Sequence, residues 1–245
     1  MFLILGTGTF LNAQESKDYV MFETMMLTPD YKNLKTLGEK MRAHNAKFHK
    51  DVPYKAAVYN ISTGPNSGKM IWMMGPVKYT HLDARPGEGG HDEDWLTNVM
   101  PFVKEIHTTE YWRMDDKLSN LSMMDGDNSK YPIIMVRYSE INEEHMYSLN
   151  SFYEMISTTI KAMEGDNPWG LYYNEFLQGD LGRHVAGVSF LKNWAEFDDD
   201  SYNFKETFEK AVGKDKWQNF MDMREKLFTN TWDEIWTYNA YMSGK

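Results

Sequence analysis

Two glutamates recur at corresponding places in two similar segments of the chain, and each stands two residues before a tryptophan. Glu110 precedes Trp112, and Glu234 precedes Trp236. A pair of buried carboxyl groups can act as general base and general acid when burial raises the pKa of one of them. A duplication would also place two carboxyl groups at corresponding positions, so catalysis and common ancestry both explain the pair.

A second pair of charged residues lies in the first strand predicted for each segment. Glu23 and Arg137 correspond when the chain is aligned with itself at an offset of 114 residues. Side chains alternate along a strand, so one face there is mixed and the other is apolar. The apolar faces hold Val20, Phe22, Ile134 and Val136. We expect the apolar faces to pack on helices. We expect Glu23 and Arg137 to face a space between two sheets.

Aromatic and methionine side chains recur on the faces that carry these charges. A chamber lined by such side chains with a few charges suits a small, flat, partly apolar molecule. The alternative is that the same side chains only fill a core. The candidate ligand-binding residues are Glu23, Tyr59, Glu110, Trp112, Arg137, Tyr173, His184, Glu234 and Trp236.

The seven histidines form no recognisable motif. His44 and His49 are five residues apart on a predicted helix and would not share a face, so no metal site is expected. His91 precedes the acidic run Asp92-Glu93-Asp94, which we interpret as a solvated helix start favoured by the helix dipole.

Motifs that would announce a cofactor are missing from the sequence. It contains no P-loop, dinucleotide fingerprint, Gly-x-Ser-x-Gly elbow or His-Glu-x-x-His. His107 and His184 lie near or in predicted strands and could ligate a haem iron, although a hydrogen-bonded histidine is the commoner case. No cofactor is therefore expected, and the sequence leaves open whether the protein is an enzyme.

The chain is organised as a tandem repeat. At an offset of 114 residues Val58-Tyr59-Asn60 falls on Tyr172-Tyr173-Asn174, and at an offset of 124 residues Glu110 falls on Glu234. The ten additional residues are expected near 198–213. The predicted division is a signal segment at 1–14, a first repeat at 15–118, a polar linker at 119–130 and a second repeat at 131–245.

Each repeat shows the order strand, helix, strand, strand, helix, strand, which is the ferredoxin-like unit. In the first repeat these elements are expected at 19–27, 31–50, 56–62, 69–74, a helix from Trp95, and 109–114. In the second repeat they are expected at 133–138, 145–164, 171–177, 183–190, a helix from Trp217, and 232–238. One unit leaves one face of its sheet uncovered, so we expect an α+β fold in which the two units pack sheet on sheet.

In this element order the chain resembles the dimeric α+β barrel superfamily, with both halves fused in one polypeptide. Families with this barrel include cofactor-free monooxygenases, haem-binding chlorite-dismutase-like enzymes and binding proteins, and the fold alone does not choose among them. The predicted function is the binding of a small apolar or aromatic molecule between the sheets. The alternatives are a cofactor-independent monooxygenase, a haem protein, and a structural or interaction protein without a ligand.

Composition narrows the classes of partner. The chain has 245 residues, a net charge of −10 and no cysteine. The missing cysteines exclude disulfides, thiolate metal sites and a cysteine nucleophile. The acidic balance argues against a nucleic-acid partner. A monomer and a homo-oligomer are both compatible with the sequence.

Residues 1–14 read MFLILGTGTFLNAQ, an apolar run followed by small and polar residues. This pattern is typical of the end of a secretory signal, and the final Asn-Ala-Gln resembles signals of Bacteroidetes-type bacteria. The alternative is a buried first strand at Phe2–Leu5. No later stretch reaches the roughly 18 apolar residues of a membrane span. We therefore expect a periplasmic or secreted protein.

Overall fold

The structure is a computed structural model that describes residues 18–85, 89–198 and 203–245. The predicted signal segment at 1–14 lies outside the described residues. The strands are β1 (Met21–Pro29), β2 (Ala56–Thr63), β3 (Met70–Val77), β4 (Val103–Met114), β5 (Ile133–Ile141), β6 (Trp169–Asn174), β7 (Val185–Leu191) and β8 (Phe228–Tyr238). The helices are α1 (Leu34–Phe48), α2 (Tyr79–Asp83), α3 (His91–Asp94), α4 (Leu149–Ala162), α5 (Phe204–Phe208) and α6 (Trp217–Leu227).

The strands close into one antiparallel barrel in the order β1-β3-β2-β8-β5-β7-β6-β4. Each half supplies four adjacent strands in the ferredoxin-like order. The edge strand β2 of the first half pairs with β8 of the second, and β4 pairs with β6. The predicted α+β fold of two ferredoxin-like units is therefore confirmed, with the two sheets joined at both edges.

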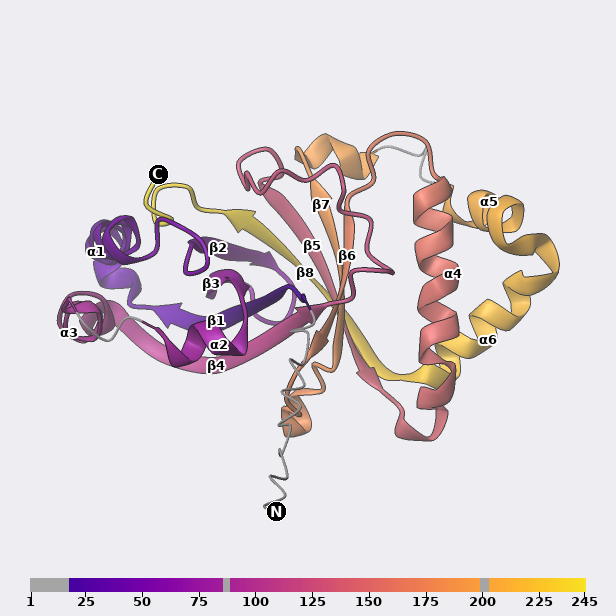
Figure 1. Cartoon of the computed structure of the whole chain (residues 1–245), viewed down its shortest axis with the longest axis horizontal. Helices are drawn as coiled ribbons and strands as arrows, with labels where there is room; N and C mark the ends of the chain where they lie inside the picture. Colours follow the sequence, from indigo (N-terminus) through magenta and orange to yellow (C-terminus); the bar gives the residue numbers. More distant parts are fainter. Residues whose placement is uncertain (1–17, 86–88, 199–202) are drawn as a thin grey trace, which may run out of the picture.

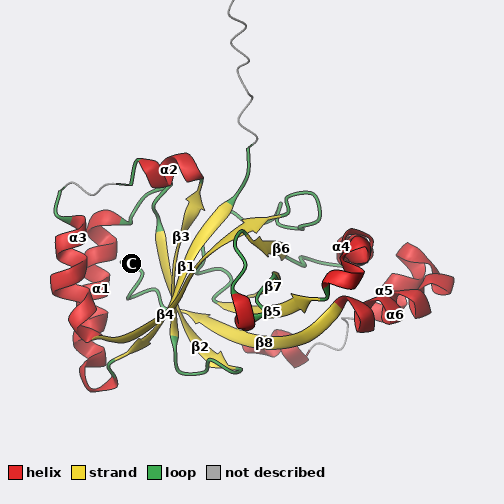
Figure 2. Cartoon of the chain, turned by 90° about the horizontal axis from the view of Figure 1, so that it is seen from below, coloured by secondary structure: helices red, strands yellow, loops and turns green. Residues whose placement is uncertain are grey.

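Helices cover only the outside of the barrel. The helices α1 and α3 lie on the first half, and α4, α5 and α6 lie on the second (Figure 1). Seen from below, the strands fan out between these two groups of helices (Figure 2). Buried side chains accordingly form a cluster under each group of helices and a separate cluster inside the barrel. None of the described helices is both long and apolar enough to cross a membrane.

The prediction of which strand face lies inside is wrong. Phe22, Ile134 and Val136 belong to the cluster inside the barrel, whereas Glu23 and Arg137 lie on the outer side of their strands. The inner face is enclosed by both sheets and is largely shielded from solvent, so it favours the uniformly apolar set. The outer face reaches solvent wherever a helix does not cover it, so charged side chains can find partners there.

The register of the strands also corrects the alignment of the two repeats. Phe22 lies opposite Trp112, and Ile134 lies opposite Trp236. The first strands therefore correspond at an offset of 112 residues, not 114. It follows that Glu23 does not correspond to Arg137, and no pair of opposite charges is generated by the pseudo-twofold at these positions.

The sequence alignment of the two repeats is also wrong by one residue at the tyrosines, where it matches Tyr59 with Tyr173. Tyr59 lies opposite Tyr238 at the junction of β2 with β8, and Tyr172 lies opposite Met114 at the junction of β6 with β4. Tyr59 therefore corresponds to Tyr172. Tyr173 points to the outer side, where it packs under the helices of the second half.

Each half sends the segment that follows its last strand onto the other half. After β4, the backbone N–H of Leu171 donates to Ser119 Oγ at 3.0 Å, and Ser157 Oγ donates to the Leu118 carbonyl at 2.5 Å. We call residues 115–120 the first strap. Its last two residues belong to the predicted linker, so part of that linker packs against the second half.

The second strap, residues 239–245, repeats these contacts on the first half. The backbone N–H of Val58 donates to Ser243 Oγ at 2.8 Å, and Asn45 Nδ2 donates to the Met242 carbonyl at 2.8 Å. Met242 is buried in the core under α1, as Leu118 is buried under α4. The two straps therefore hold the halves together by an exchange of equivalent segments.

Removing either strap hydroxyl should destabilise the chain. Ser119→Ala and Ser243→Ala each leave a buried backbone N–H without its acceptor, and each should lower the free energy of unfolding by about 1–3 kcal/mol. Urea unfolding followed by circular dichroism measures the change. Ser67→Ala, on an exposed hairpin, is the control. Strap variants as stable as this control would show that the two serine hydroxyls contribute nothing to stability.

Candidate functional site

A cavity of about 340 Å³ lies inside the barrel, between the two sheets. We call it the chamber. Its volume falls within the range of small-molecule pockets. Side chains from both sheets line it, including Phe22, Met73, Ile134, Val188 and Phe190. The connection from β4 to β5 adds Leu121, Met124, Gly126 and Asn128 to the lining, so the predicted linker also contributes to the chamber.

Two indole rings stand between the chamber and a pair of buried carboxyl groups. Trp112 and Trp236 line the chamber, and their Nε1 atoms donate to Glu110 Oε2 and Glu234 Oε2, each at 2.9 Å. Both glutamates are completely buried and do not line the chamber. Because a tryptophan N–H can only donate, these bonds fix the rings of both tryptophans. The Glu-x-Trp pattern occurs once in each half and therefore forms two equivalent parts of the chamber wall.

The partner of Glu110 is an arginine that sequence reasoning did not select. Arg183 is 4% exposed and lies 3.1 Å from Glu110 Oε2. It also donates to the Tyr138 hydroxyl at 2.9 Å, with its guanidinium 4.4 Å from the centre of that ring. Burial raises the pKa of the Glu110 carboxyl, and the charge of Arg183 opposes that rise. Arg183 lies in the β6–β7 connection, two residues before β7 begins, and only closure of the barrel brings this position against β4.

The corresponding carboxyl group, Glu234, has a neutral partner. Asn66 Nδ2 donates to Glu234 Oε1 at 2.7 Å, and Lys69 Nζ donates to the other end of the Asn66 amide at 2.9 Å. Asn66 belongs to the β2–β3 connection, and Arg183 belongs to the equivalent β6–β7 connection. The two glutamates are therefore repeated, while their partners are not.

Two tyrosine hydroxyls in the chamber have no hydrogen-bond partner among the described residues. They belong to Tyr59 and Tyr172, the pair that the pseudo-twofold relates. Burial raises the pKa of both phenols, so both remain neutral and can donate. A hydroxyl without a partner in an apolar cavity is a site where a ligand atom can accept a hydrogen bond.

The remaining predicted site residues lie away from the chamber. Glu23 is 3% exposed and pairs with Arg85 on the outer side of β1. Arg137 forms a double hydrogen bond with Asp233, at 2.8 and 2.7 Å, on the outer side of β5 and β8. Of the nine candidates, Tyr59, Trp112 and Trp236 line the chamber, and Glu110 and Glu234 support its wall.

The two histidines considered for haem do not suit that role. His184 Nδ1 accepts the backbone N–H of Ile141 at 3.0 Å, so its proton lies on Nε2, the nitrogen that would have to ligate iron. His107 Nε2 is hydrogen-bonded to Thr28 Oγ1 at 2.7 Å. No histidine of the described part of the chain lines the chamber. These residues do not fit a histidine-ligated haem in the chamber.

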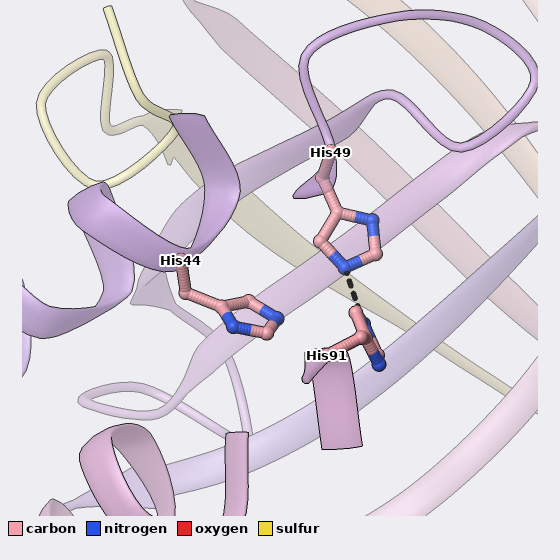
Figure 3. Close-up of side chains that lie close together, drawn as sticks. All are labelled: His44, His49 and His91. Carbon is pink, nitrogen blue, oxygen red and sulfur yellow. Dashed lines mark hydrogen bonds between the residues drawn. The ribbon is translucent and has the colours of Figure 1, made fainter. Parts of the chain in front are cut away.

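Three other histidines come together on the outer side of the first half, under α1 and α3 (Figure 3). One ring nitrogen from each of His44, His49 and His91 lies within 4.8 Å of the other two. The expectation that His44 and His49 would not come together is therefore wrong. The spacing argument failed because α1 ends at Phe48 and His49 leaves the helical conformation, with φ −127° and ψ 31°.

Comparison with known proteins supports the fold. No protein-family model and no curated protein sequence matches the chain. Among solved structures, an anthrone oxidase-like protein is 11% identical with a TM-score of 0.54, and the match covers 91% of this chain and 92% of that one. A provisionally named chlorite dismutase gives 11% identity and a TM-score of 0.54 over 93% and 99% of the two chains. A provisionally named monooxygenase of Fusobacterium nucleatum gives 10% identity and a TM-score of 0.52 over 91% and 93%.

The chain therefore has the dimeric α+β barrel fold, with both halves in one polypeptide. Its interior is an apolar chamber with two available phenol hydroxyls. At these identities the similarity establishes the fold, and the function has to be argued from the chamber itself.

The positive charge of Arg183 should be required for the stability of the fold, because it balances the buried carboxylate of Glu110. In Arg183→Met the carboxylate loses its buried counter-charge, and the free energy of unfolding should fall by about 3–5 kcal/mol at pH 8. The loss should be smaller at pH 5. The raised pKa lets Glu110 take up a proton in the folded state, so the stability of the variant falls as pH rises from the unfolded-state pKa, about 4.3, through the folded-state value.

Urea unfolding at both pH values measures this dependence. The matched control is Arg137→Met, whose ion pair with Asp233 is about half exposed and is expected to contribute at most about 1 kcal/mol. If Arg183→Met and Arg137→Met cost the same at pH 8, the buried pair does not support the chamber wall.

Proposed function

We propose that this protein binds a small, largely apolar and aromatic molecule in the chamber between its two sheets. The observation that carries the proposal is a cavity of about 340 Å³ whose aromatic lining includes Tyr59 and Tyr172, two phenols whose hydroxyls bond to no other described residue.

The proposal includes an extracytoplasmic location. The mass of the mature chain from its host tests this part, since cleavage after Gln14 would remove residues 1–14.

The lining determines which molecules fit. Trp112 and Trp236 offer flat faces, and their edges are already hydrogen-bonded to glutamates, so a ligand meets their apolar surfaces. The hydroxyls of Tyr59 and Tyr172 favour a ligand with an oxygen or nitrogen acceptor. Among the described residues, no carboxylate lines the chamber to balance the charge of a cationic ligand. A cationic ligand is therefore disfavoured, and an aromatic molecule with one or two acceptor atoms is the expected ligand class.

The neutral fluorescent probe N-phenyl-1-naphthylamine should bind in the chamber and become brighter there. Ala186 lines the chamber and is buried, and Ala186→Phe places a ring in the space that the probe would occupy. The dissociation constant of the probe should rise at least tenfold in this variant. Fluorescence titration measures the constant, and thermal unfolding checks that the variant folds.

Ala195→Phe adds the same ring at an exposed position and should leave probe binding unchanged. A wild-type protein that fails to bind the probe would contradict the proposal. Equal binding by wild type and Ala186→Phe would place the probe elsewhere and would also contradict it. Native mass spectrometry of protein from its host would then identify any bound molecule directly.

A second candidate function is oxygen-dependent conversion of the bound molecule. Solved structures named as an anthrone oxidase-like protein and as a monooxygenase share the fold, which favours this candidate. An electron-rich substrate held without competing water could react with O₂ using few protein groups. Oxygen uptake with anthrone, which takes up O₂ to give anthraquinone and water, measures this activity. Oxygen uptake that is no faster with the protein than without it would contradict this activity and leave binding as the only proposed function.

A further inference from the structure

Two of the three clustered histidines are held in one tautomer by carboxylates. His44 Nδ1 donates to Asp94 Oδ2 at 2.8 Å, and His91 Nδ1 donates to Asp92 Oδ1 at 2.7 Å. An ionised carboxylate can only accept a hydrogen bond, so the proton of each neutral ring lies on Nδ1. The Nε2 atoms of His44 and His91 therefore carry lone pairs.

The third histidine is held in the same tautomer by the backbone. His49 Nδ1 donates to the Tyr54 carbonyl at 2.8 Å, so its Nε2 also carries a lone pair. That Nε2 lies 3.0 Å from His91 Nε2, as drawn in Figure 3. His44 Nε2 is buried and has no hydrogen-bond partner. Three lone pairs gathered in one buried place repel one another unless a proton or a cation lies among them.

A cation among the three nitrogens would remove this repulsion. A neutral imidazole ligates a metal through the ring nitrogen that carries no proton, which is Nε2 in each of these rings. The carboxylates of Asp92 and Asp94 behind the rings supply negative charge to balance a divalent ion.

We propose that His44, His49 and His91 bind one divalent transition-metal ion through their Nε2 atoms, with Zn²⁺ as the favoured ion. Imidazole nitrogens suit zinc and its neighbours, whereas calcium and magnesium prefer oxygen ligands. Zn–N bonds of about 2.0–2.1 Å in tetrahedral geometry place the nitrogens about 3.3 Å apart. Small rotations of the side chains reach this spacing from the nitrogen separations present in the cluster.

The surroundings of the cluster agree with a metal site. Histidines that ligate a metal commonly donate their other ring N–H to a carboxylate or a carbonyl, as all three rings do here. The rings of Trp72 and Trp95 lie 5.0 Å from His49 and 5.1 Å from His44, and they shield the site from water. The His91 side chain is 12% exposed, so a fourth ligand such as water can reach the ion from that side.

The site is independent of the chamber, so the two proposals can fail separately. The experiment uses the full chain without a polyhistidine tag, stripped of metal with a chelator. Titration with Co²⁺ should give the absorption bands of tetrahedral cobalt at one equivalent per chain, and Zn²⁺ should abolish them. The tryptophan fluorescence from Trp72 and Trp95 should fall as Co²⁺ binds.

Two variants test the assignment of the ligands. His91→Gln should remove the stoichiometric cobalt bands, whereas His145→Gln, at a histidine far from the cluster in the second half, should keep them. Asp94→Asn leaves every ligand in place but weakens the hold on His44, and it should reduce metal affinity about 10–100-fold. Circular dichroism confirms that each variant is folded.

Several outcomes would overturn the proposal. A wild-type chain that binds no Co²⁺ or Zn²⁺ at micromolar concentration refutes the site. Tetrahedral binding that survives in His91→Gln places the metal elsewhere. If His91→Gln fails to fold, an unchanged affinity in folded Asp94→Asn contradicts the assigned role of the His44 ring.

Discussion

Neither half of this chain can cover both faces of its own sheet. A four-stranded sheet with helices on one side leaves an apolar face and two edge strands without partners. The structure satisfies both needs at once, because β2 pairs with β8, β4 pairs with β6, and the two apolar faces enclose one space. The exchange of the two straps follows from the same requirement, since each half lacks the residues that complete the core under its helices.

The enclosed space stays open because its largest side chains are held in place. An indole that was free to rotate would fill much of the interior, as aromatic side chains do in ordinary cores. Trp112 and Trp236 cannot turn inward without breaking a hydrogen bond to a buried carboxyl group. The carboxyl groups would keep Arg183 and Asn66 as partners, but each buried indole N–H would lose its acceptor, and a buried donor without an acceptor costs about 1–3 kcal/mol. The pair of carboxyl groups, first considered as a catalytic acid and base, thus has a structural role in holding the wall of the chamber.

The sequence was sufficient for the order of the elements and for the duplication, because hydrophobic periodicity and repeated patterns are local properties. It was not sufficient for the inner and outer faces. Alternation shows that Phe22 and Glu23 lie on opposite faces, but not which face is enclosed. An offset wrong by two residues was enough to pair Glu23 with Arg137. Contacts between distant segments, such as Glu110 with Arg183, depend on barrel closure and have no signal in either segment alone.

The histidine cluster was missed for a related reason. Spacing along an ideal helix separates His44 from His49, but the helix ends between them, and the exact end of a helix is poorly defined by sequence. His91 then arrives from a segment more than forty residues away. The aromatic rings around the cluster belong to the core of the first half, so the group is built into the packing under α1 and α3.

The unequal partners of the two repeated glutamates have a consequence for recognition. A chamber with perfect twofold symmetry would offer any asymmetric guest two equivalent poses, related by half a turn. Here one side of the wall is backed by the guanidinium of Arg183 and the other by the amide of Asn66. The two poses therefore differ in energy by the interaction of the guest's dipole with one buried positive charge. If a molecule binds in the chamber, divergence of the duplicated halves would therefore favour one of its two orientations.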